Sequence, residues 1–270
     1  MDTQRIYEKF LVRCAGLADA LAIEDLLRWN ARVVPAPQGG DYRARLMGHQ
    51  AGILQGLRTD PEYVECVKEL EVARVAGSLD SLQSANVAWA AKQVDRSSKA
   101  PKELVIEVAA ASSRTQDAWT EARKTGDGGD YLLALNNFLR LKREEGRLYN
   151  PSSPYDGLME EFEPGITAAE IQVRFDALKE PLQALMSKAS SNKTDKQAPS
   201  TVVPRDAQER MAQALVKRMG FEGRLDVIDT HPFSIGIHPY DARCVVRYNG
   251  DARPFHFQCL KGLFFVMVQL

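Results

Sequence analysis

The sequence predicts a mainly α-helical protein with a small β element near its C-terminal end. Apolar side chains recur at intervals of three and four residues along most of the 270-residue chain, as they do on the buried face of a helix. Turns rich in proline and glycine separate these runs. The pattern changes only at residues 244–248 (Cys-Val-Val-Arg-Tyr), which are rich in β-branched residues and alternate as in a strand.

The N-terminal elements are predicted from apolar stripes between turn signals. One or two helices are expected over residues 5–29, followed by a turn at 35–40 and a helix from 42 to about 57. Asp60 precedes a proline, which is typical of an N-cap and a first helical position. The helix that begins there carries one set of apolar side chains on one face: Tyr63, Cys66, Val67 and Leu70.

The central elements are also helices. Pro101 begins a long one, whose stripe is Leu104, Val108, Ala111, Thr115, Trp119 and Ala122. The glycine-rich residues 126–129 end this helix, and residues 131–149 form the next one. Thr167 and Glu170 form a capping box, because the threonine hydroxyl and the glutamate can each satisfy a free backbone N–H. The helix after it has a regular stripe: Ile171, Phe175, Leu178, Leu182 and Leu185.

The predicted organisation has four consecutive segments. Residues 1–186 form a helical region, and residues 187–203, which are polar and poor in apolar side chains, form a surface loop or linker. Residues 204–248 form a region that contains the most unusual motifs, a short helix at 208–219 and the strand. Residues 249–270 form a divergent tail.

The composition favours a cytoplasmic protein without nucleic-acid or membrane partners. Lys and Arg (35) nearly balance Asp and Glu (36), so the net charge of -1 gives no general attraction to polyanions. Four cysteines are too few for a disulfide scaffold, and none forms a C-x-x-C pair. The N-terminal residues are charged where a signal peptide needs an apolar run. The longest apolar stretch, residues 263–270, is far shorter than the roughly 18 residues that span a bilayer.

The four histidines, His49, His231, His238 and His256, offer no metal-binding pattern. A helical site such as H-E-x-x-H needs two histidines four residues apart, and no pair has that spacing. His231 and His238 each precede a proline, which excludes a shared helix interior. We expect these two to cap turns or to bond to the backbone, and we predict no metal ligand and no catalytic residue.

The densest cluster of charged and histidine side chains lies at residues 223–248. Arg243 and Arg247 would project from the same sheet face, because side chains alternate along a strand. Since a guanidinium binds a carboxylate bidentately, the pair could hold a substrate carboxylate. The alternative is that Asp241 and Arg243 form a structural ion pair at a turn, and the spacing alone favours this alternative.

Ordered motifs in this cluster and upstream resemble a known family. The segments in the cluster are residues 223–226 (G-R-L-D), His231-Pro232-Phe233, Asp241-Ala242-Arg243 and Arg247-Tyr248. Upstream they are residues 26–30 (L-L-R-W-N), Arg43, residues 101–104 (P-K-E-L), Trp119 with Ala122-Arg123, residues 155–158 (Y-D-G-L) and residues 162–165 (F-E-P-G). This set, over about residues 5 to 248, is similar to the carboxypeptidase Taq family of H-E-x-x-H metallocarboxypeptidases.

The resemblance implies an α-helical, zincin-like carboxypeptidase fold, a dimer, and dependence on zinc or another divalent metal. The family removes C-terminal residues from peptides, with the metal held by the two histidines of H-E-x-x-H and a downstream glutamate. That motif should follow Tyr248, and the chain diverges from about Asn249 without it. In addition, Asn30 stands where the family has an aspartate, and Val245 replaces the threonine of D-x-R-x-T.

Three functional hypotheses follow. In the first, the chain is the N-terminal half of such a carboxypeptidase, truncated before the metal motif, inactive as written and without a cofactor. In the second, it is a non-catalytic helical module that pairs with a full-length relative or captures peptide C-termini through Arg243 and Arg247. In the third, it is an unstable fragment, because the apolar, β-prone residues 263–270 resemble an aggregation-prone segment.

Overall fold

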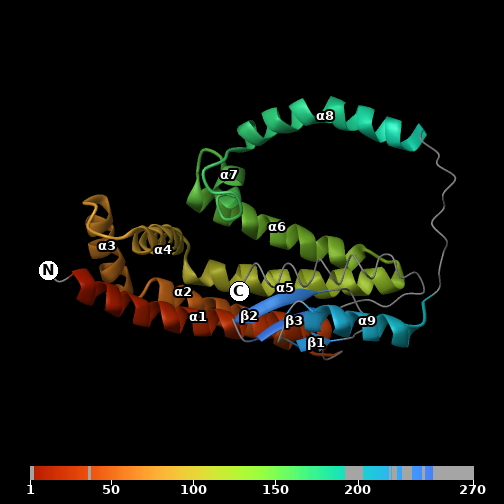
Figure 1. Ribbon diagram of the computed structural model, residues 1–270, viewed down its shortest axis with the longest axis horizontal. Coiled ribbons are helices and arrows are strands. Elements are labelled where there is room, and N and C mark those ends of the chain that lie inside the picture. Colours follow the sequence, from red (N-terminus) through yellow and green to blue (C-terminus); the bar gives the residue numbers. More distant parts are fainter. Residues whose placement is uncertain are drawn as a thin grey trace. The chain divides into compact units, whose positions relative to one another are not determined.

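The computed structural model describes residues 3–35, 38–191, 203–218, 220, 224–226, 233–238 and 241–245. Helices dominate these residues, and a small sheet is formed near the C-terminal end (Figure 1). The elements in order are α1 (Thr3–Val33), α2 (Gly40–Arg58), α3 (Pro61–Val75), α4 (Ser81–Lys99), α5 (Lys102–Thr125), α6 (Gly129–Tyr149), α7 (Pro154–Met159), α8 (Ala168–Ser191), α9 (Arg205–Arg218), β1 (Arg224–Asp226), β2 (Ser234–His238) and β3 (Asp241–Val245). This confirms the predicted fold class.

The chain forms two compact units that share α1. Unit 1 comprises Met1–Ala20 and Gly39–Asn192, and unit 2 comprises Leu21–Gln38 and Lys193–Leu270. The second half of α1 therefore belongs with the motif-bearing C-terminal region, although the two are far apart in the sequence. The predicted division into four consecutive segments places residues 1–186 in one helical region. It did not anticipate that residues 21–38 belong to unit 2.

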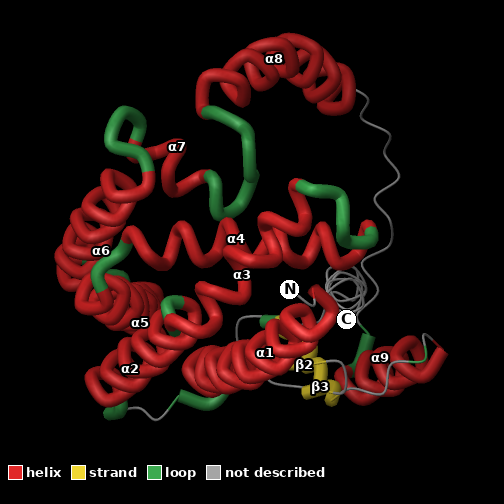
Figure 2. Tube along the Cα trace, turned by 90° about the vertical axis from the view of Figure 1, so that its left-hand side faces the viewer, coloured by secondary structure: helices red, strands yellow, loops and turns green. Residues whose placement is uncertain are grey.

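Unit 1 is a helical assembly in which α5 packs along both α2 and α6 (Figure 2). Leu104 and Ala111 of α5 are buried against Leu141 of α6, with Val108 and Phe138 beside them. The predicted α5 stripe thus faces the core. This burial is the main stabilising contribution expected of an amphipathic helix.

An aromatic group fixes the first part of α1 to α3 within unit 1. The ring centres of Tyr7 and Phe10 lie 5.6 Å apart, and Phe10 stacks on Tyr63 of α3 at 6.0 Å. All three side chains are buried. Burial raises the pKa of the Tyr63 hydroxyl, so this residue acts here as a neutral core side chain.

Two glycines allow α6 and α7 to approach closely. A Cβ atom on Gly146 would lie 2.5 Å from the carbonyl oxygen of Pro154, and one on Gly157 would lie 2.8 Å from the carbonyl oxygen of Gly146. Any larger residue would therefore push the backbones apart. This contact explains the glycine in the Y-D-G-L motif at residues 155–158 as a packing requirement.

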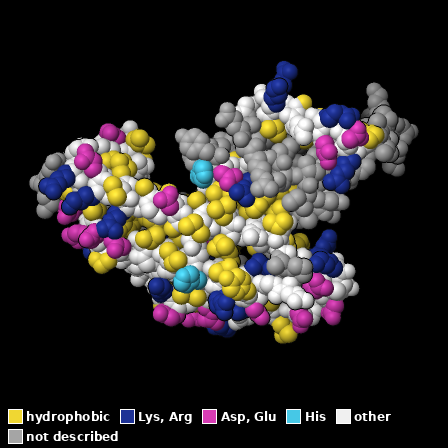
Figure 3. All heavy atoms as spheres, turned by 90° about the horizontal axis from the view of Figure 1, so that it is seen from below, with side chains coloured by type: hydrophobic (Ala, Val, Ile, Leu, Met, Phe, Trp, Pro, Cys, Tyr) yellow, Lys and Arg dark blue, Asp and Glu magenta, His cyan; other side chains and the backbone are white. Residues whose placement is uncertain are grey.

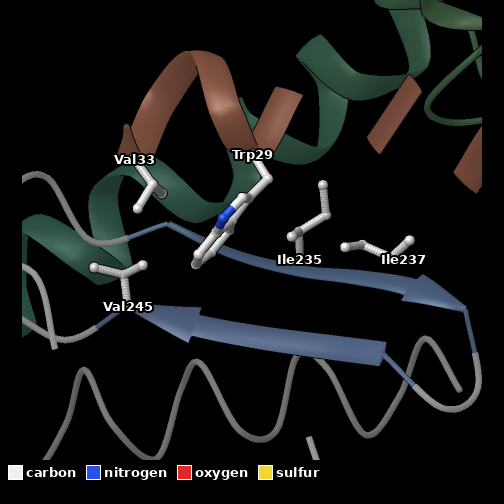
Figure 4. Close-up of a cluster of buried hydrophobic side chains, with 5 residues drawn as sticks. All are labelled: Trp29, Val33, Ile235, Ile237 and Val245. Carbon is white, nitrogen blue, oxygen red and sulfur yellow. The ribbon is translucent and has the colours of Figure 1, made fainter. Parts of the chain in front are cut away.

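Unit 2 contains a three-stranded sheet in the order β1-β3-β2. β1 pairs with β3 in parallel, and β2 pairs with β3 antiparallel. One face of the sheet packs against the second half of α1. Trp29 and Val33 of α1 point toward the strand residues Ile235, Ile237 and Val245, and all five side chains are buried (Figure 4).

Both helix starts that were predicted from capping residues are confirmed. The Asp60 carboxylate accepts a hydrogen bond of 3.0 Å from the backbone N–H of Tyr63, with Pro61 as the first residue of α3. Thr167 and Glu170 form the reciprocal capping box: the Thr167 N–H donates to Glu170 over 2.8 Å, and the Glu170 N–H donates to Thr167 Oγ1 over 3.3 Å. Local side-chain chemistry therefore sets these boundaries.

Other predicted boundaries were wrong. α8 continues to Ser191, so residues 187–191 are helical rather than part of a linker. Ser, Lys and Ala are tolerated in a last helical turn, and Lys188 interacts favourably with the helix dipole there. The predicted strand begins earlier, at Asp241, and residues 246–248 lie outside the described part of the chain. β1, β2, α4 and α7 were not anticipated.

Candidate functional site

Arg243 is the centre of the predicted carboxylate site. It lies on β3 and donates to Asp241 through two hydrogen bonds, Nε to Oδ1 at 3.0 Å and a terminal nitrogen to Oδ2 at 2.8 Å. Only 15% of the Arg243 side chain and 26% of the Asp241 side chain are exposed. A planar guanidinium held by both carboxylate oxygens is the most specific geometry available to this pair.

The position of Arg243 follows from strand alternation. Residues 241, 243 and 245 share one face of β3, and Val245 on that face is buried against α1. The guanidinium carbon of Arg243 lies 5.4 Å from the centre of the Trp29 ring. The cation therefore lies over an aromatic face at the edge of the apolar cluster.

The opposite face of β3 carries small buried side chains. Ala242 and Cys244 are both buried, and Cys244 is directly opposite Ser234 of β2. The Ser234 hydroxyl donates to the Cys244 sulfur over 3.4 Å. Burial raises the pKa of the Cys244 thiol, so the group is a neutral packing element rather than a reactive thiolate.

Phe233 of the His-Pro-Phe motif also faces α1. The guanidinium of Arg32 lies 5.1 Å from the centre of the Phe233 ring. Because Trp29 and Arg32 are three residues apart on α1, they lie on the same helix face. Two guanidinium–aromatic contacts thus join α1 to the sheet region. In one the arginine belongs to α1, and in the other it belongs to β3.

The predicted site residues are only partly within the described part of the chain. The structure brings Phe233, Asp241 and Arg243 together against α1, whereas His231, Pro232 and Arg247 lie outside the described residues. The ion pair between Asp241 and Arg243, which was the alternative interpretation, is present. A role of Arg243 and Arg247 in holding a substrate carboxylate stays a prediction.

The described residues do not form a binding site for the metal that the family resemblance implies. Among them, no group of three or more His, Cys, Asp or Glu side chains is placed to hold a metal ion. His49 is exposed on α2, and His238 is exposed at the end of β2. A catalytic zinc takes three protein ligands and a water, and the described side chains do not supply such a set.

A second candidate site was missed by sequence reasoning. A cavity of about 600 Å³ in unit 1 is lined by residues of α2, α4, α5, α6 and α7 and of the loops around α7. At its wall the Arg96 guanidinium lies 3.6 Å from the centre of the Tyr149 ring. Arg96 also donates to the Gly157 carbonyl over 2.9 Å and to the Glu161 carboxylate over 3.3 Å. Arg96 therefore joins three elements around the cavity.

The cavity wall combines polar and apolar surface, and its described charges are largely paired. Tyr149 donates to Glu145 over 3.0 Å, and Glu145 also accepts from Lys142. Burial, with the nearby Glu145 charge, raises the pKa of Tyr149. Lys92 lies 3.8 Å from Glu160. Such a wall offers both hydrogen-bonding groups and apolar surface to a ligand.

Asp156 of the Y-D-G-L motif also lines this cavity. Hydrogen bonds from the Ser153 side chain and, secondly, from the Ala168 backbone N–H lower its pKa, and the latter bond is 2.8 Å long. Because Ala168 is the first residue of α8, Asp156 tethers the start of that helix to α7. The family-like motif at residues 155–158 therefore has a structural role at both its aspartate and its glycine.

The surface agrees with the near-neutral composition. Figure 3 shows acidic and basic side chains interspersed over the face that it presents, together with exposed hydrophobic side chains. In the described part of the chain, every helix is too short or too polar to cross a bilayer.

Several solved structures share this fold. The BsuCP crystal structure matches with a TM-score of 0.85 and 22% identity, and the match covers 95% of this chain and 52% of that one. Trypanosoma cruzi metallocarboxypeptidase 1 matches with a TM-score of 0.78 and 22% identity, over 97% of this chain and 54% of that one. The described fold is thus shared with these solved structures.

Sequence comparison identifies the family. The model of the carboxypeptidase Taq (M32) metallopeptidases matches residues 9–260, and the chain belongs to this family. Thermostable carboxypeptidase 1 of Thermus thermophilus is 29% identical over 93% of this chain. Carboxypeptidase 1 of Bacillus subtilis is 26% identical over 90% of it. The chain spans only 52% and 49% of these two relatives, about half of their length.

Proposed function

We propose that this chain supplies the N-terminal half of a metal-dependent carboxypeptidase fold and that, by itself, it does not hydrolyse peptides. One observation carries the proposal. The family match extends over residues 9–260, yet the sequence contains no H-E-x-x-H, the motif that holds the metal in the family it resembles. In a complete enzyme of this kind, the metal would polarise the scissile carbonyl and activate a water.

The reaction class of the complete enzyme would be removal of C-terminal residues from peptides, with zinc or another divalent metal. The names of the relatives support this class, because each is a carboxypeptidase. For this chain alone we propose no cofactor, a cytoplasmic location and no nucleic-acid or membrane partner. Dimerisation is proposed from the family resemblance only.

The predicted carboxylate role of Arg243 competes with its ion pair. Asp241 already occupies two donors of the guanidinium, and the Trp29 ring covers one face. This geometry favours Arg243 as a positioning residue that ties the sheet to α1. Capture of peptide C-termini would require Arg243 to exchange Asp241 for the ligand, with help from Arg247.

A peptidase assay tests the main proposal. The purified 270-residue chain, incubated with zinc or cobalt and a peptide with a free C-terminus, is expected to release no C-terminal residue. Carboxypeptidase 1 of Bacillus subtilis, assayed in parallel, controls for the substrate and the metal. Metal-dependent release by the chain itself would refute the proposed inactivity.

A binding assay tests the capture role. Carboxylate-ended and amidated forms of one peptide are titrated against the chain and against the variant Arg243→Ala. Preference for the carboxylate form, lost in the variant, would support capture. Equal binding of the two forms would leave Arg243 with its structural role alone.

A second candidate function is that of a non-catalytic helical interaction module. The observation that favours it is α8, a long helix in which no residue is buried although it carries a regular apolar stripe. The third hypothesis, an unstable fragment, concerns residues 263–270, which lie outside the described part of the chain. A broad, non-cooperative thermal melt would favour that hypothesis over both proposals.

A further inference from the structure

α8 presents an apolar stripe along one face, and among the described residues no side chain buries it. The helix has 24 residues, and none of them is buried. The exposed fractions of Phe175, Leu178, Leu182 and Leu185 range from 54% to 63%. Large apolar side chains that are exposed in a row, with polar residues on both sides, mark a protein interaction surface.

The spacing of the stripe is that of a helix-pairing seam. Residues Ile171, Phe175, Leu178, Leu182, Leu185 and Ala189 follow one another at alternating intervals of four and three. This is the a/d pattern of a heptad repeat, in which each side chain enters a gap between side chains of a facing helix. We call these six residues the α8 seam.

The charges on α8 are segregated around the seam. Arg174, Lys179 and Lys188 occupy the positions that flank a heptad seam, equivalent to e and g. Asp176 and Glu180 lie at positions away from it, and Glu170 is held in the capping box. A helix that docks on the seam therefore meets three cationic side chains at its margins and no flanking carboxylate.

This arrangement disfavours a second copy of the same helix. In a parallel pair, Arg174 would face Lys179 of the other copy. In an antiparallel pair, the residues on each side of the seam would face the same residues of the other copy. Both orientations bring like charges together across the seam, which opposes association. The charge pattern instead matches a partner with acidic flanks.

A lipid surface matches the seam less well than a helix does. Helices that lie on membranes carry Lys and Arg across their polar face, opposite a broad apolar face. The face of α8 opposite its seam carries Asp176 and Glu180 together with the exposed Val173, and the three acidic side chains of the helix balance its three basic ones. Beside the seam, the flanking positions that are not basic hold Gln172, Pro181 and Met186, so the apolar face is widened only near Pro181 and Met186.

The helix itself needs such a partner. Most helical stability in proteins comes from the packing of an apolar face, and Pro181 within α8 removes one backbone hydrogen bond. Pro181 occupies a flanking position rather than the seam, so it leaves the docking face intact. Since the start of α8 is tied to α7 through Asp156, the seam is presented from a fixed anchor.

We propose that the α8 seam docks an amphipathic helix of a different polypeptide, one whose apolar stripe is flanked by Asp and Glu. This interaction is independent of peptide hydrolysis and of the carboxylate role of Arg243. Its specificity comes from the flanks: Arg174, Lys179 and Lys188 attract acidic margins and repel basic ones, while the seam supplies the apolar contact.

Two designed peptides test the proposal. Both are helices of the length of α8 with Leu at a and d; one carries Glu at e and g, and the other carries Lys there. Fluorescence anisotropy with the full chain is expected to show binding of the Glu peptide at least tenfold tighter than binding of the Lys peptide. The triple variant Arg174→Glu, Lys179→Glu, Lys188→Glu is expected to reverse that preference.

A seam variant and a matched control complete the test. The double change Phe175→Glu and Leu182→Glu is expected to weaken binding of the Glu peptide at least tenfold, whereas Glu180→Gln on the opposite face leaves it unchanged. Since α8 contributes no buried residue, an unchanged thermal melt confirms that the rest of the chain remains folded. If the seam variant unfolds the chain, the peptide preference of the triple variant tests the proposal instead.

Three results would overturn the proposal. Equal affinity for the two peptides, or no binding of either, would remove the role of the flanks. A concentration-dependent dimer that the seam variant abolishes, seen by sedimentation, would make the occupant a second copy. Binding to vesicles of anionic phospholipid through the seam, without peptide discrimination, would make it a membrane surface.

Discussion

The guanidinium of Arg243 lies over the ring of Trp29, 5.4 Å from its centre, while it holds Asp241 in a bidentate ion pair. These residues belong to the two motifs, L-L-R-W-N and D-A-R, that lie near opposite ends of the chain. Their contact helps to join the second half of α1 and the small sheet in unit 2. It assigns both motifs a structural role in this chain.

Trp29→Ala is expected to destabilise the chain by about 3–5 kcal/mol, because only 4% of the indole is exposed and its removal leaves a cavity between α1 and the sheet. Denaturant unfolding, followed by a probe in unit 2, measures the change. Trp89→Ala is the control: this indole is 57% exposed, so its removal should cost within about 0.5 kcal/mol. Equal effects of the two variants would contradict the packing role of Trp29.

The Asp241–Arg243 pair is expected to show a coupling energy of about 1–3 kcal/mol in a double-mutant cycle with alanine at both positions. The pair is largely buried and bidentate, so solvent screens it little. Asp95 and Lys99 on α4 provide a matched exposed pair, whose coupling should be about 0.3–0.5 kcal/mol. A coupling at Arg243 no greater than that of the exposed pair would show that the bidentate geometry is not formed in solution.

Gly157→Ala is expected to destabilise unit 1 by about 1–3 kcal/mol, because the new Cβ would lie 2.8 Å from the Gly146 carbonyl oxygen and force α6 and α7 apart. The control is Gly56→Ala on α2, where nothing lies within 4 Å of the new Cβ. That change should stabilise the chain by about 0.5–1 kcal/mol through helix propensity. Thermal melts of the two variants should therefore shift in opposite directions, and a common direction would be inconsistent with the close helix crossing.

Asp156 gives a pH-dependent contribution to stability. Hydrogen bonds from Ser153 and Ala168 lower its pKa in the folded chain, so its contribution is present above the pKa of the unfolded state and is lost as the pH falls through the folded value. The melting temperatures of the chain and of Asp156→Asn should differ most at neutral pH and converge below about pH 4. A difference that stays constant across that range would show that the carboxylate charge has no part in tethering α8.

Local signals predicted helices well where a cap or an apolar stripe was present. Asp60, Thr167 and Glu170 marked two helix starts correctly, because capping depends on residues within one turn. α4 was missed, although Asp80 and Gln83 form a capping box at its start. Its buried positions are small or medium-sized, Val87, Ala90 and Val94, so the apolar stripe is weak, and the capping box was the signal that could have revealed it.

The strands and the cavity could not be predicted from such local sequence signals. β2 is only five residues long, and its stability depends on pairing with β3 and on contact with α1 rather than on its own sequence. The cavity wall joins Arg96, Tyr149 and Glu161 from separate helices and loops, and no local pattern reports such a contact. The Asp241–Arg243 ion pair was anticipated as well, but at a turn. The structure places both residues on β3, where two residues apart share one face.

Metal retention by the chain tests the central claim, that this chain alone has no catalytic metal site. The purified 270-residue chain is equilibrated with zinc, dialysed against metal-free buffer and its metal content measured beside that of carboxypeptidase 1 of Bacillus subtilis treated identically. The account predicts far less than stoichiometric zinc in the chain. One tightly held zinc ion per chain, accompanied by release of C-terminal residues from a peptide, would contradict it.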